Sequence, residues 1–138
     1  MNPDTPPSDL ADVLAANAAF YKAFQDLDME AMCEVWRQDG ESCCIHPGWA
    51  PLVGWSAVRQ SFVAIFANSG WLRVVPRKVA VHLAGDLAWV RCIEVVSSLG
   101  DRGTAQGRVA ATNLFSRVDG RWRMVLHHGS PIAVDLDD

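Results

Sequence analysis

The amino-acid sequence predicts an α+β fold, with three N-terminal helices packed on one face of a curved antiparallel sheet. Hydrophobic residues recur at helical spacing up to about residue 70 and then alternate with a period of two as far as residue 132. Short turns join the later segments, and long strands joined in this way twist and curl. The 138 residues fit one domain, expected at 8–132, with flexible termini at 1–7 and 133–138.

The first half of the chain carries three segments with helical spacing of hydrophobic residues. They are predicted between Ser8 and Phe24, between Asp28 and Gly40, and between Gly54 and Gly70. Ser8 and Asp28 are the expected N-caps, because their side-chain oxygens can accept hydrogen bonds from the first free N–H groups of a helix. A short strand at residues 41–46 and a hairpin arm at residues 50–53 are expected before the third helix.

The second half of the chain contains four strand-like segments joined by turns that are rich in Gly and Asp. They are residues 72–83, 87–99, 104–118 and 120–132. Pro76 lies within the first of them and has no N–H to donate, so it predicts an edge strand or a bulge at this point. The four segments together form a meander, and its curvature favours an enclosed space between the sheet and the helices.

The residues of the last strand alternate between two faces. Trp122, Met124, Leu126 and His128 share one face, whereas His127 lies on the other face with the arginines. Because the first face is otherwise hydrophobic, His128 is predicted to point into the core or into a cavity. His127 is expected at a subunit contact. The alternative for His128 is a hydrogen bond to the backbone, with no chemical role.

Two further polar residues lie on hydrophobic strand faces. Glu94 shares its face with the small residues Ala88, Val90 and Cys92, and this face is favoured as the inward one because it leaves room for a cavity. The alternative is that Glu94 pairs with an arginine such as Arg108 at the sheet surface. Asn113 shares its face with Val109, Ala111 and Phe115, and its alternative role is to bridge backbone groups across a bulge.

Several short segments carry a resemblance to a known family. They are residues 32–36 (MCEVW), 46–49 (HPGW), 54–55 (GW), 111–115 (ATNLF), 120–123 (GRWR) and 127–130 (HHGS). In this order and spacing they resemble the nuclear transport factor 2-like superfamily and, within it, the SnoaL-like group, over residues 8–132. The resemblance implies a cone-shaped α+β fold, an interior pocket and frequently a homodimer formed through the sheet. The superfamily contains both enzymes and non-catalytic association domains, so the fold alone leaves the function open.

The candidate site is a cavity in which His46, Glu94, Asn113 and His128 converge. Burial raises the pKa of a carboxylate and lowers that of a histidine, so both groups approach the working range of a general acid or base. Asn113 could hydrogen-bond a carbonyl group or a developing oxyanion. The alternative for His46, which precedes Pro47, is to orient a turn. The pocket wall is expected to comprise Tyr21, Phe24, Trp36, Trp49, Trp55, Phe62 and Phe115, although aromatic residues at helical spacing also suit a core.

These residues predict a protein that binds a small apolar or aromatic molecule and acts as an acid–base isomerase, dehydratase or hydratase. The alternative is a non-catalytic homodimeric association or accessory domain. Members of the superfamily that this sequence resembles, such as ketosteroid isomerase, rely on an acidic pocket residue, usually an Asp. Here no Asp lies in the hydrophobic stripe of a strand, so Glu94 has to supply the carboxylate, and histidine has to act alone if Glu94 faces outward.

The amino-acid composition limits the classes of binding partner and cofactor that are expected. The net charge of −4 and the lack of a Lys/Arg cluster argue against a nucleic-acid or membrane partner. The N-terminus lacks the features of a signal peptide and the four cysteines form no C-x-x-C motif, so a cytoplasmic protein with reduced cysteines is expected. Cys44, His46 and His128 are suitable metal ligands but lack the tight spacing of a metal site. Without a Gly-rich phosphate loop or a G-x-S-x-G motif, no metal or other cofactor is expected.

Overall fold

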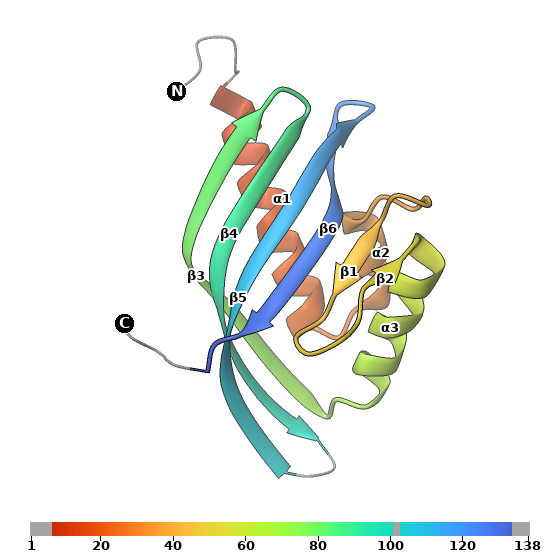
Figure 1. Ribbon diagram of the computed structural model, residues 1–138, viewed down its shortest axis with the longest axis vertical. Helices are drawn as coiled ribbons and strands as arrows, with labels where there is room; N and C mark the ends of the chain where they lie inside the picture. The colour runs from red at the N-terminus through yellow and green to blue at the C-terminus, as the bar shows by residue number, and fades with distance from the viewer. Residues whose placement is uncertain (1–6, 101–102, 134–138) are drawn as a thin grey trace.

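The computed structural model describes residues 7–100 and 103–133 of the chain (Figure 1). The described residues form three helices: α1 (Pro7–Gln25), α2 (Met29–Val35) and α3 (Trp55–Ala67). Residues 1–6 and 134–138, which hold most of the termini expected to be flexible, lie outside the described residues, as do residues 101–102 of a predicted turn. No helix in the described part of the chain has the length and apolar character needed to cross a membrane.

In the part of the chain that the structure describes, six strands form one curved sheet, in the order β2-β1-β6-β5-β4-β3. Their bounds are β1 (Cys43–Ile45), β2 (Leu52–Val53), β3 (Trp71–Ala84), β4 (Leu87–Gly100), β5 (Gly103–Val118) and β6 (Arg121–Pro131). β1 runs parallel to β6, and all other neighbours are antiparallel. Helix α1 crosses one face of the sheet, and α2 and α3 flank it beside β1 and β2 (Figure 1). The predicted α+β architecture is therefore confirmed.

The second helix is shorter than its sequence pattern predicts. Asp28 caps it as expected, since its Oδ1 accepts a hydrogen bond from the backbone N–H of Ala31 at 3.1 Å. The helix ends at Val35 and does not continue to Gly40. Trp36 is already extended and forms a parallel bridge with Met124 of β6, so pairing with the sheet ends the helix early.

Pro76 has the position that its missing N–H predicts. It lies in β3, which is one of the two edge strands of the described sheet. A register shift also occurs between Arg77 and Ala80, where Lys78 has a φ of +54°. Both expectations for this segment, an edge and a bulge, are thus met in one strand.

A second irregularity reverses the faces of the last strand. Leu114 of β5 pairs with Leu126, but the next residue of β5 pairs with Met124, so Val125 has no partner and forms a bulge. Before the bulge, Met124 is buried; after it, His127 is buried and His128 is exposed. The prediction that His128 points into the interior is therefore wrong. A strict period of two fails wherever one strand contains an extra residue.

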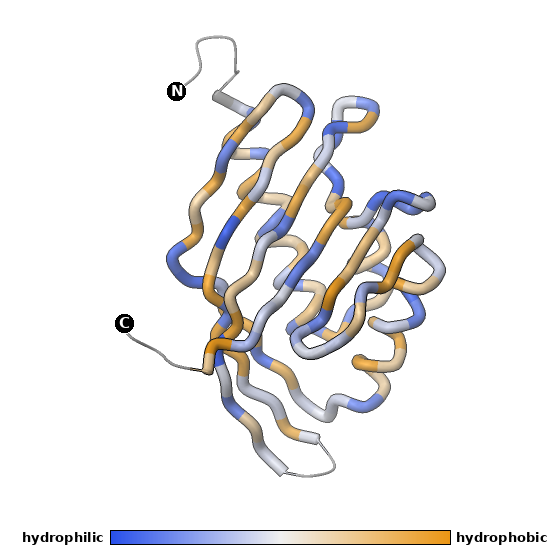
Figure 2. Tube along the Cα trace, in the orientation of Figure 1, coloured by the Kyte–Doolittle hydropathy of each residue, from blue (hydrophilic) through white to orange (hydrophobic). Residues whose placement is uncertain are grey.

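The core lies between the helices and the inward face of the sheet. Hydrophobic and hydrophilic residues are interspersed along the strands (Figure 2), and buried and exposed residues alternate in the first part of β3, β4 and β6, so one face of the sheet is buried. Phe20 of α1 packs edge-on against Trp36 and Phe62, and all three side chains are fully buried. Aromatic pairs of this kind stabilise a core beyond the area that they bury. The packing also positions α1 against the strands that carry the candidate site.

Candidate active site

A cavity of about 430 Å³ opens between the inward face of the sheet, the end of α1, α3 and the loop that follows β1. Its volume lies within the range of small-molecule sites. Hydrophobic side chains form most of the wall, and His46, Glu94 and His127 are the buried titratable groups among its lining residues. The hydrophobic part of the wall comprises Phe24, Pro47, Trp49, Ile65, Leu72, Val74, Val96, Val109 and Pro131.

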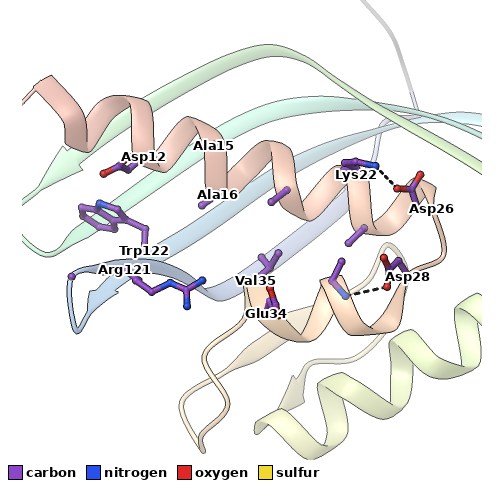
Figure 3. A pocket seen from close by; sticks show the side chains of 14 residues that line it. Asp12, Ala15, Ala16, Lys22, Asp26, Asp28, Glu34, Val35, Arg121 and Trp122 are labelled. Atoms are coloured by element: carbon purple, nitrogen blue, oxygen red, sulfur yellow. Dashed lines mark hydrogen bonds and ion pairs between the residues drawn. The ribbon is translucent and has the colours of Figure 1, made fainter.

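A larger groove, of about 550 Å³, lies between α1, α2 and the turn that leads into β6 (Figure 3). All of its charged side chains are exposed. Among them, Lys22 and Asp26 form an ion pair at 2.6 Å across one turn of α1. Acid–base sites instead gather titratable groups that are buried away from water, and this groove holds none. The smaller cavity is therefore the candidate site.

Glu94 lies on β4 with its carboxylate on the buried face of the sheet. The residue is only 3% exposed, which confirms the favoured inward face and contradicts a position at the sheet surface. Its Oε2 accepts a hydrogen bond from the hydroxyl of Tyr21 at 2.7 Å. Burial raises the pKa of Glu94 to about 7, and the hydrogen bond from Tyr21 opposes this shift. A carboxyl group in this environment can both donate and accept a proton near neutral pH.

Tyr21 connects the groups of the site, a role beyond the wall position that the sequence predicts. Its hydroxyl donates to Glu94 and accepts a hydrogen bond from Asn113 Nδ2 at 3.0 Å. Cys92 Sγ lies 3.2 Å from the same oxygen, and its thiol hydrogen can fill the remaining acceptor position. Burial and the nearby Glu94 raise the pKa of Tyr21, so the phenol stays protonated.

Asn113 determines which nitrogen of His127 carries the hydrogen. Asn113 Nδ2 donates to Asn17 Oδ1 at 2.9 Å and to Tyr21, so Asn113 Oδ1 is the acceptor for His127 Nδ1 at 2.6 Å. His127 Nδ1 must therefore carry a hydrogen. Burial lowers the pKa of His127 to about 3, which keeps the ring neutral. Its Nε2 is then an unprotonated acceptor, 3.8 Å from Glu94 Oε2.

His46 lies in the cavity wall with the opposite tautomer. The hydroxyl of Ser61 donates to the carbonyl oxygen of Val58 at 2.6 Å, so this hydroxyl accepts from His46 Nε2 at 2.9 Å. The hydrogen of His46 therefore lies on Nε2, and Nδ1 is the acceptor. Burial lowers the pKa of His46 to about 4. Its ring packs edge-on against Trp49 and Phe62, which hold its orientation.

The structure brings together three of the four predicted catalytic residues. His46, Glu94 and Asn113 belong to the site, whereas His128 lies on the outer face of the sheet, and His127 takes the inner position because of the bulge at Val125. Among the predicted wall residues, Phe24 and Trp49 line the cavity. Tyr21 lies in the hydrogen-bond network. The remaining four, Trp36, Trp55, Phe62 and Phe115, do not line it and belong to the core or pack against it.

Three residues of the site are missing from the site that the sequence predicts. His127 was expected at a subunit contact, but the bulge turns it into the interior, where it is buried. Ser61 carries no pattern that distinguishes it from other helical serines. Asn17 does carry a signal, because it is a polar residue in the hydrophobic stripe of α1 and is only 3% exposed. For metal binding, Cys44 Sγ lies 3.6 and 3.8 Å from the two ring nitrogens of His46. Within residues 7–100 and 103–133, no group of three or more His, Cys, Asp or Glu residues is arranged to hold a metal ion.

Comparison with known proteins identifies the family. The family model of the SnoaL-like domain matches residues 13–135, which is most of the chain. The chain belongs to the SnoaL-like domain family. A similar crystal structure is that of a proposed dehydratase of the nuclear transport factor 2-like family from Streptomyces avermitilis. This SnoaL-like chain is 33% identical to it, with a TM-score of 0.88, and the match covers 94% of this chain and 100% of that chain.

Two other similar proteins have names that refer to different functions. A proposed calcium/calmodulin-dependent protein kinase type II association domain from Thiobacillus denitrificans is 36% identical, with a TM-score of 0.76, and the match covers 86% of this chain and 93% of that chain. The F-box protein SKIP8 of Arabidopsis thaliana is 27% identical over 123 residues, which are 89% of this SnoaL-like chain. The chain spans about half of that protein, 51% of its length. Membership of the SnoaL-like family is therefore established, but proteins that share this fold differ in activity.

Proposed function

We propose that this SnoaL-like protein binds a small apolar or aromatic molecule in the 430 Å³ cavity and performs acid–base chemistry on it, as an isomerase, dehydratase or hydratase. The observation that supports this most is the pair formed by Glu94 and His127 at one wall of the cavity. One is a carboxyl group with a pKa of about 7, and the other is a neutral imidazole with an unprotonated nitrogen. The buried environment raises the pKa of Glu94 and lowers that of His127, and pKa values shifted in opposite directions are a recurrent feature of acid–base sites.

Each polar residue has a role in this proposal. Glu94 transfers the proton, because its pKa lies near the operating pH. His127 Nε2 and His46 Nδ1 are acceptors for protons or hydrogen bonds. Tyr21 and Asn113 are positioning residues, since they hold Glu94 and His127 through hydrogen bonds of 2.7 and 2.6 Å. Removing water from such a site strengthens every one of these interactions.

In a dehydration, protonated Glu94 gives its proton to the departing hydroxyl as the C–O bond breaks. An imidazole, that of His46 or His127, takes the proton from the neighbouring carbon, and the electrons of that C–H bond form the double bond. Water leaves, and transfer of the proton from the imidazolium to the carboxylate restores both groups. In an isomerisation, the Glu94 carboxylate removes a proton from one carbon and returns it to another. The relative from Streptomyces avermitilis, a proposed dehydratase, supports the first reaction.

The proposal can be tested without knowledge of the natural substrate. Aromatic and terpenoid compounds are first screened for an increase in melting temperature, because a ligand of the folded state stabilises it. Compounds that bind are then incubated with the protein in D2O, and deuterium incorporation or water loss is followed by NMR. Glu94→Gln is expected to abolish water loss in a dehydration and deuterium exchange in an isomerisation, and His128→Ala is the matched control that should retain the activity. Equal exchange in the Glu94→Gln protein would exclude the proposed role of this residue.

A second candidate function is that of a homodimeric association or accessory domain. The outer face of β3 and β4 exposes large hydrophobic side chains: Trp71 and Leu87 are 50% and 48% exposed, and Trp89 is 39% exposed. Leu87 and Trp89 are neighbours on this face of β4, and adjacent exposed hydrophobic side chains favour a contact with another subunit. The relative from Thiobacillus denitrificans supports this reading as well. Sedimentation of the wild type and of a Trp89→Glu variant would test the dimer, which can exist with or without catalysis.

A cytoplasmic location is part of the same proposal. All four cysteines, Cys33, Cys43, Cys44 and Cys92, are free thiols. Burial raises the pKa of Cys92 to about 11, so this thiol is protonated and unreactive. Free thiols of this kind suit a reducing compartment. Fractionation of cells that express the full protein would test the location.

A further inference from the structure

The two central groups of the cavity are close but do not form a direct hydrogen bond. His127 Nε2 and Glu94 Oε2 are 3.8 Å apart, and both residues line the cavity. An N–H···O hydrogen bond is usually 2.7–3.2 Å long, so the gap is too wide for one. If a ligand oxygen lay about 2.8 Å from both atoms, the Nε2–oxygen–Oε2 angle would be about 85°, and a hydroxyl group can form two hydrogen bonds at such an angle.

Neither group can close the gap by moving alone. Glu94 Oε2 is held by the Tyr21 hydroxyl at 2.7 Å, and His127 Nδ1 is held by Asn113 Oδ1 at 2.6 Å. The His127 ring also packs against Phe20, with ring centroids 4.9 Å apart. Buried hydrogen-bond partners and ring packing thus hold both Glu94 and His127 in place. Because these side chains are already ordered, little conformational entropy is lost when a ligand binds.

The number of hydrogen-bond donors and acceptors at the gap limits which ligand group can bind there. His127 Nε2 has no hydrogen, because the hydrogen of the neutral ring lies on Nδ1. It therefore requires a donor. Protonated Glu94 offers one donor, and ionised Glu94 offers only acceptors. In both states the ligand must bring at least one hydrogen into the gap. An ether or a ketone brings none and leaves a buried acceptor unsatisfied, which costs binding free energy.

We infer that the gap between His127 Nε2 and Glu94 Oε2 is the seat of a neutral hydroxyl group, so that the ligands of this cavity are apolar or aromatic alcohols and phenols. The hydroxyl donates to His127 Nε2 and, when Glu94 is protonated, accepts a hydrogen bond from its carboxyl group. The surrounding wall is hydrophobic, which suits the carbon skeleton of such a molecule. This inference rests on the proposed binding of a ligand in the cavity, and it is independent of whether catalysis follows.

The location of charge in the wall agrees with a neutral group at this point. Arg108 is the cationic residue among the lining residues, and it also lines a cleft together with Arg77 and Lys78. Arg108 is only half-buried, whereas Glu94 and His127 are buried. At the gap itself, an anion would meet the electron-rich Nε2 and, above neutral pH, the carboxylate of Glu94. Like charges at such a distance in a buried site repel strongly.

Three matched probes test the inference: 2-naphthol, 2-methoxynaphthalene and 2-naphthoate, measured by calorimetry at neutral pH with the full chain. We expect 2-naphthol to bind about ten- to hundredfold more tightly than its methyl ether, because the ether leaves an acceptor unpaired. His127→Phe, which keeps the ring and removes both nitrogens, should reduce the ratio of the two affinities to about one. His128→Ala, which removes the neighbouring exposed imidazole, should leave the ratio unchanged.

The nitrogen NMR signal of His127 provides a readout in the unmodified protein, should the His127→Phe chain fail to fold. On binding of 2-naphthol, but not of the ether, the Nε2 resonance should shift in the direction of a hydrogen-bonded acceptor. Equal affinity for naphthol and ether, tighter binding of 2-naphthoate, or no binding of any probe would each overturn the hydroxyl seat. A clear preference for naphthol without deuterium exchange would preserve the seat and reject the acid–base function. Exchange without the preference would do the reverse.

Discussion

Replacing Glu94 with glutamine should change how the stability of this protein depends on pH. Burial raises the pKa of Glu94 from 4.5 to about 7, so the folded state holds this proton more tightly than the unfolded state. Below the lower value both states are protonated, and above the higher value both are ionised. The free energy of unfolding therefore falls as the pH rises through this interval, by about 3 kcal/mol in total. Glutamine does not titrate and removes the effect.

Urea unfolding followed by tryptophan fluorescence at about pH 5 and about pH 8 measures this effect. The difference in unfolding free energy between Glu94→Gln and the wild type should grow by about 2 to 3 kcal/mol from the lower pH to the higher, in favour of the variant. Effects of other groups, including the buried histidines, occur in both proteins and largely cancel. Glu41→Gln, at an exposed position, is the matched control and should follow the wild type. Parallel curves for Glu94→Gln and the wild type would refute the pKa argument.

Three further outcomes are expected. His127→Ala should lower the unfolding free energy by about 3 kcal/mol, because it creates a cavity and leaves Asn113 Oδ1 without its hydrogen-bond donor. His128→Ala, at an exposed position, should change it by less than about 0.5 kcal/mol. Chemical denaturation of the two variants measures the difference. Tyr21→Phe removes the hydrogen bond that lowers the pKa of Glu94, so a carbon NMR titration should find this pKa above that of the wild type. Burial lowers the pKa values of His46 and His127 from 6.5 to about 4 and about 3, so the folded state binds these protons more weakly than the unfolded state. The stability that is present above pH 6.5 is therefore lost as the pH falls from 6.5 to these lower pKa values. Thermal unfolding of the Glu94→Gln protein at decreasing pH measures this loss, and a constant melting temperature would contradict it.

Local patterns were sufficient for most of the secondary structure. The spacing of hydrophobic residues identified the helices and long strands because helical and extended backbones expose side chains with different periods. Asp28 as an N-cap and Pro76 at an irregular edge follow from the chemistry of single residues. The inward face of Glu94 was also predictable, because its neighbours on that face are small and hydrophobic. The end of α2 was not, since contact with Met124 of a distant strand decides it.

The candidate site shows the same division. Strand alternation placed Glu94 and Asn113 on inward faces, and both are buried there. It placed His128 inward as well, and this was wrong because Val125 is an extra residue relative to β5. A bulge depends on how two strands align, so neither strand reveals it alone. The hydrogen bond between Asn17 and Asn113 joins residues that are 96 positions apart, and no local pattern connects them.

By itself, the sequence determined the α+β architecture, the order of its elements and the presence of a carboxylate and an amide on the inner face of the sheet. These properties follow from side-chain periodicity, which is local. Only the tertiary structure decided that His127, and not its neighbour His128, faces the cavity, because that depends on the register between β5 and β6. It also decided the ionisation of Glu94 and His127, since a pKa is set by burial and by partners that the fold brings together from distant parts of the chain.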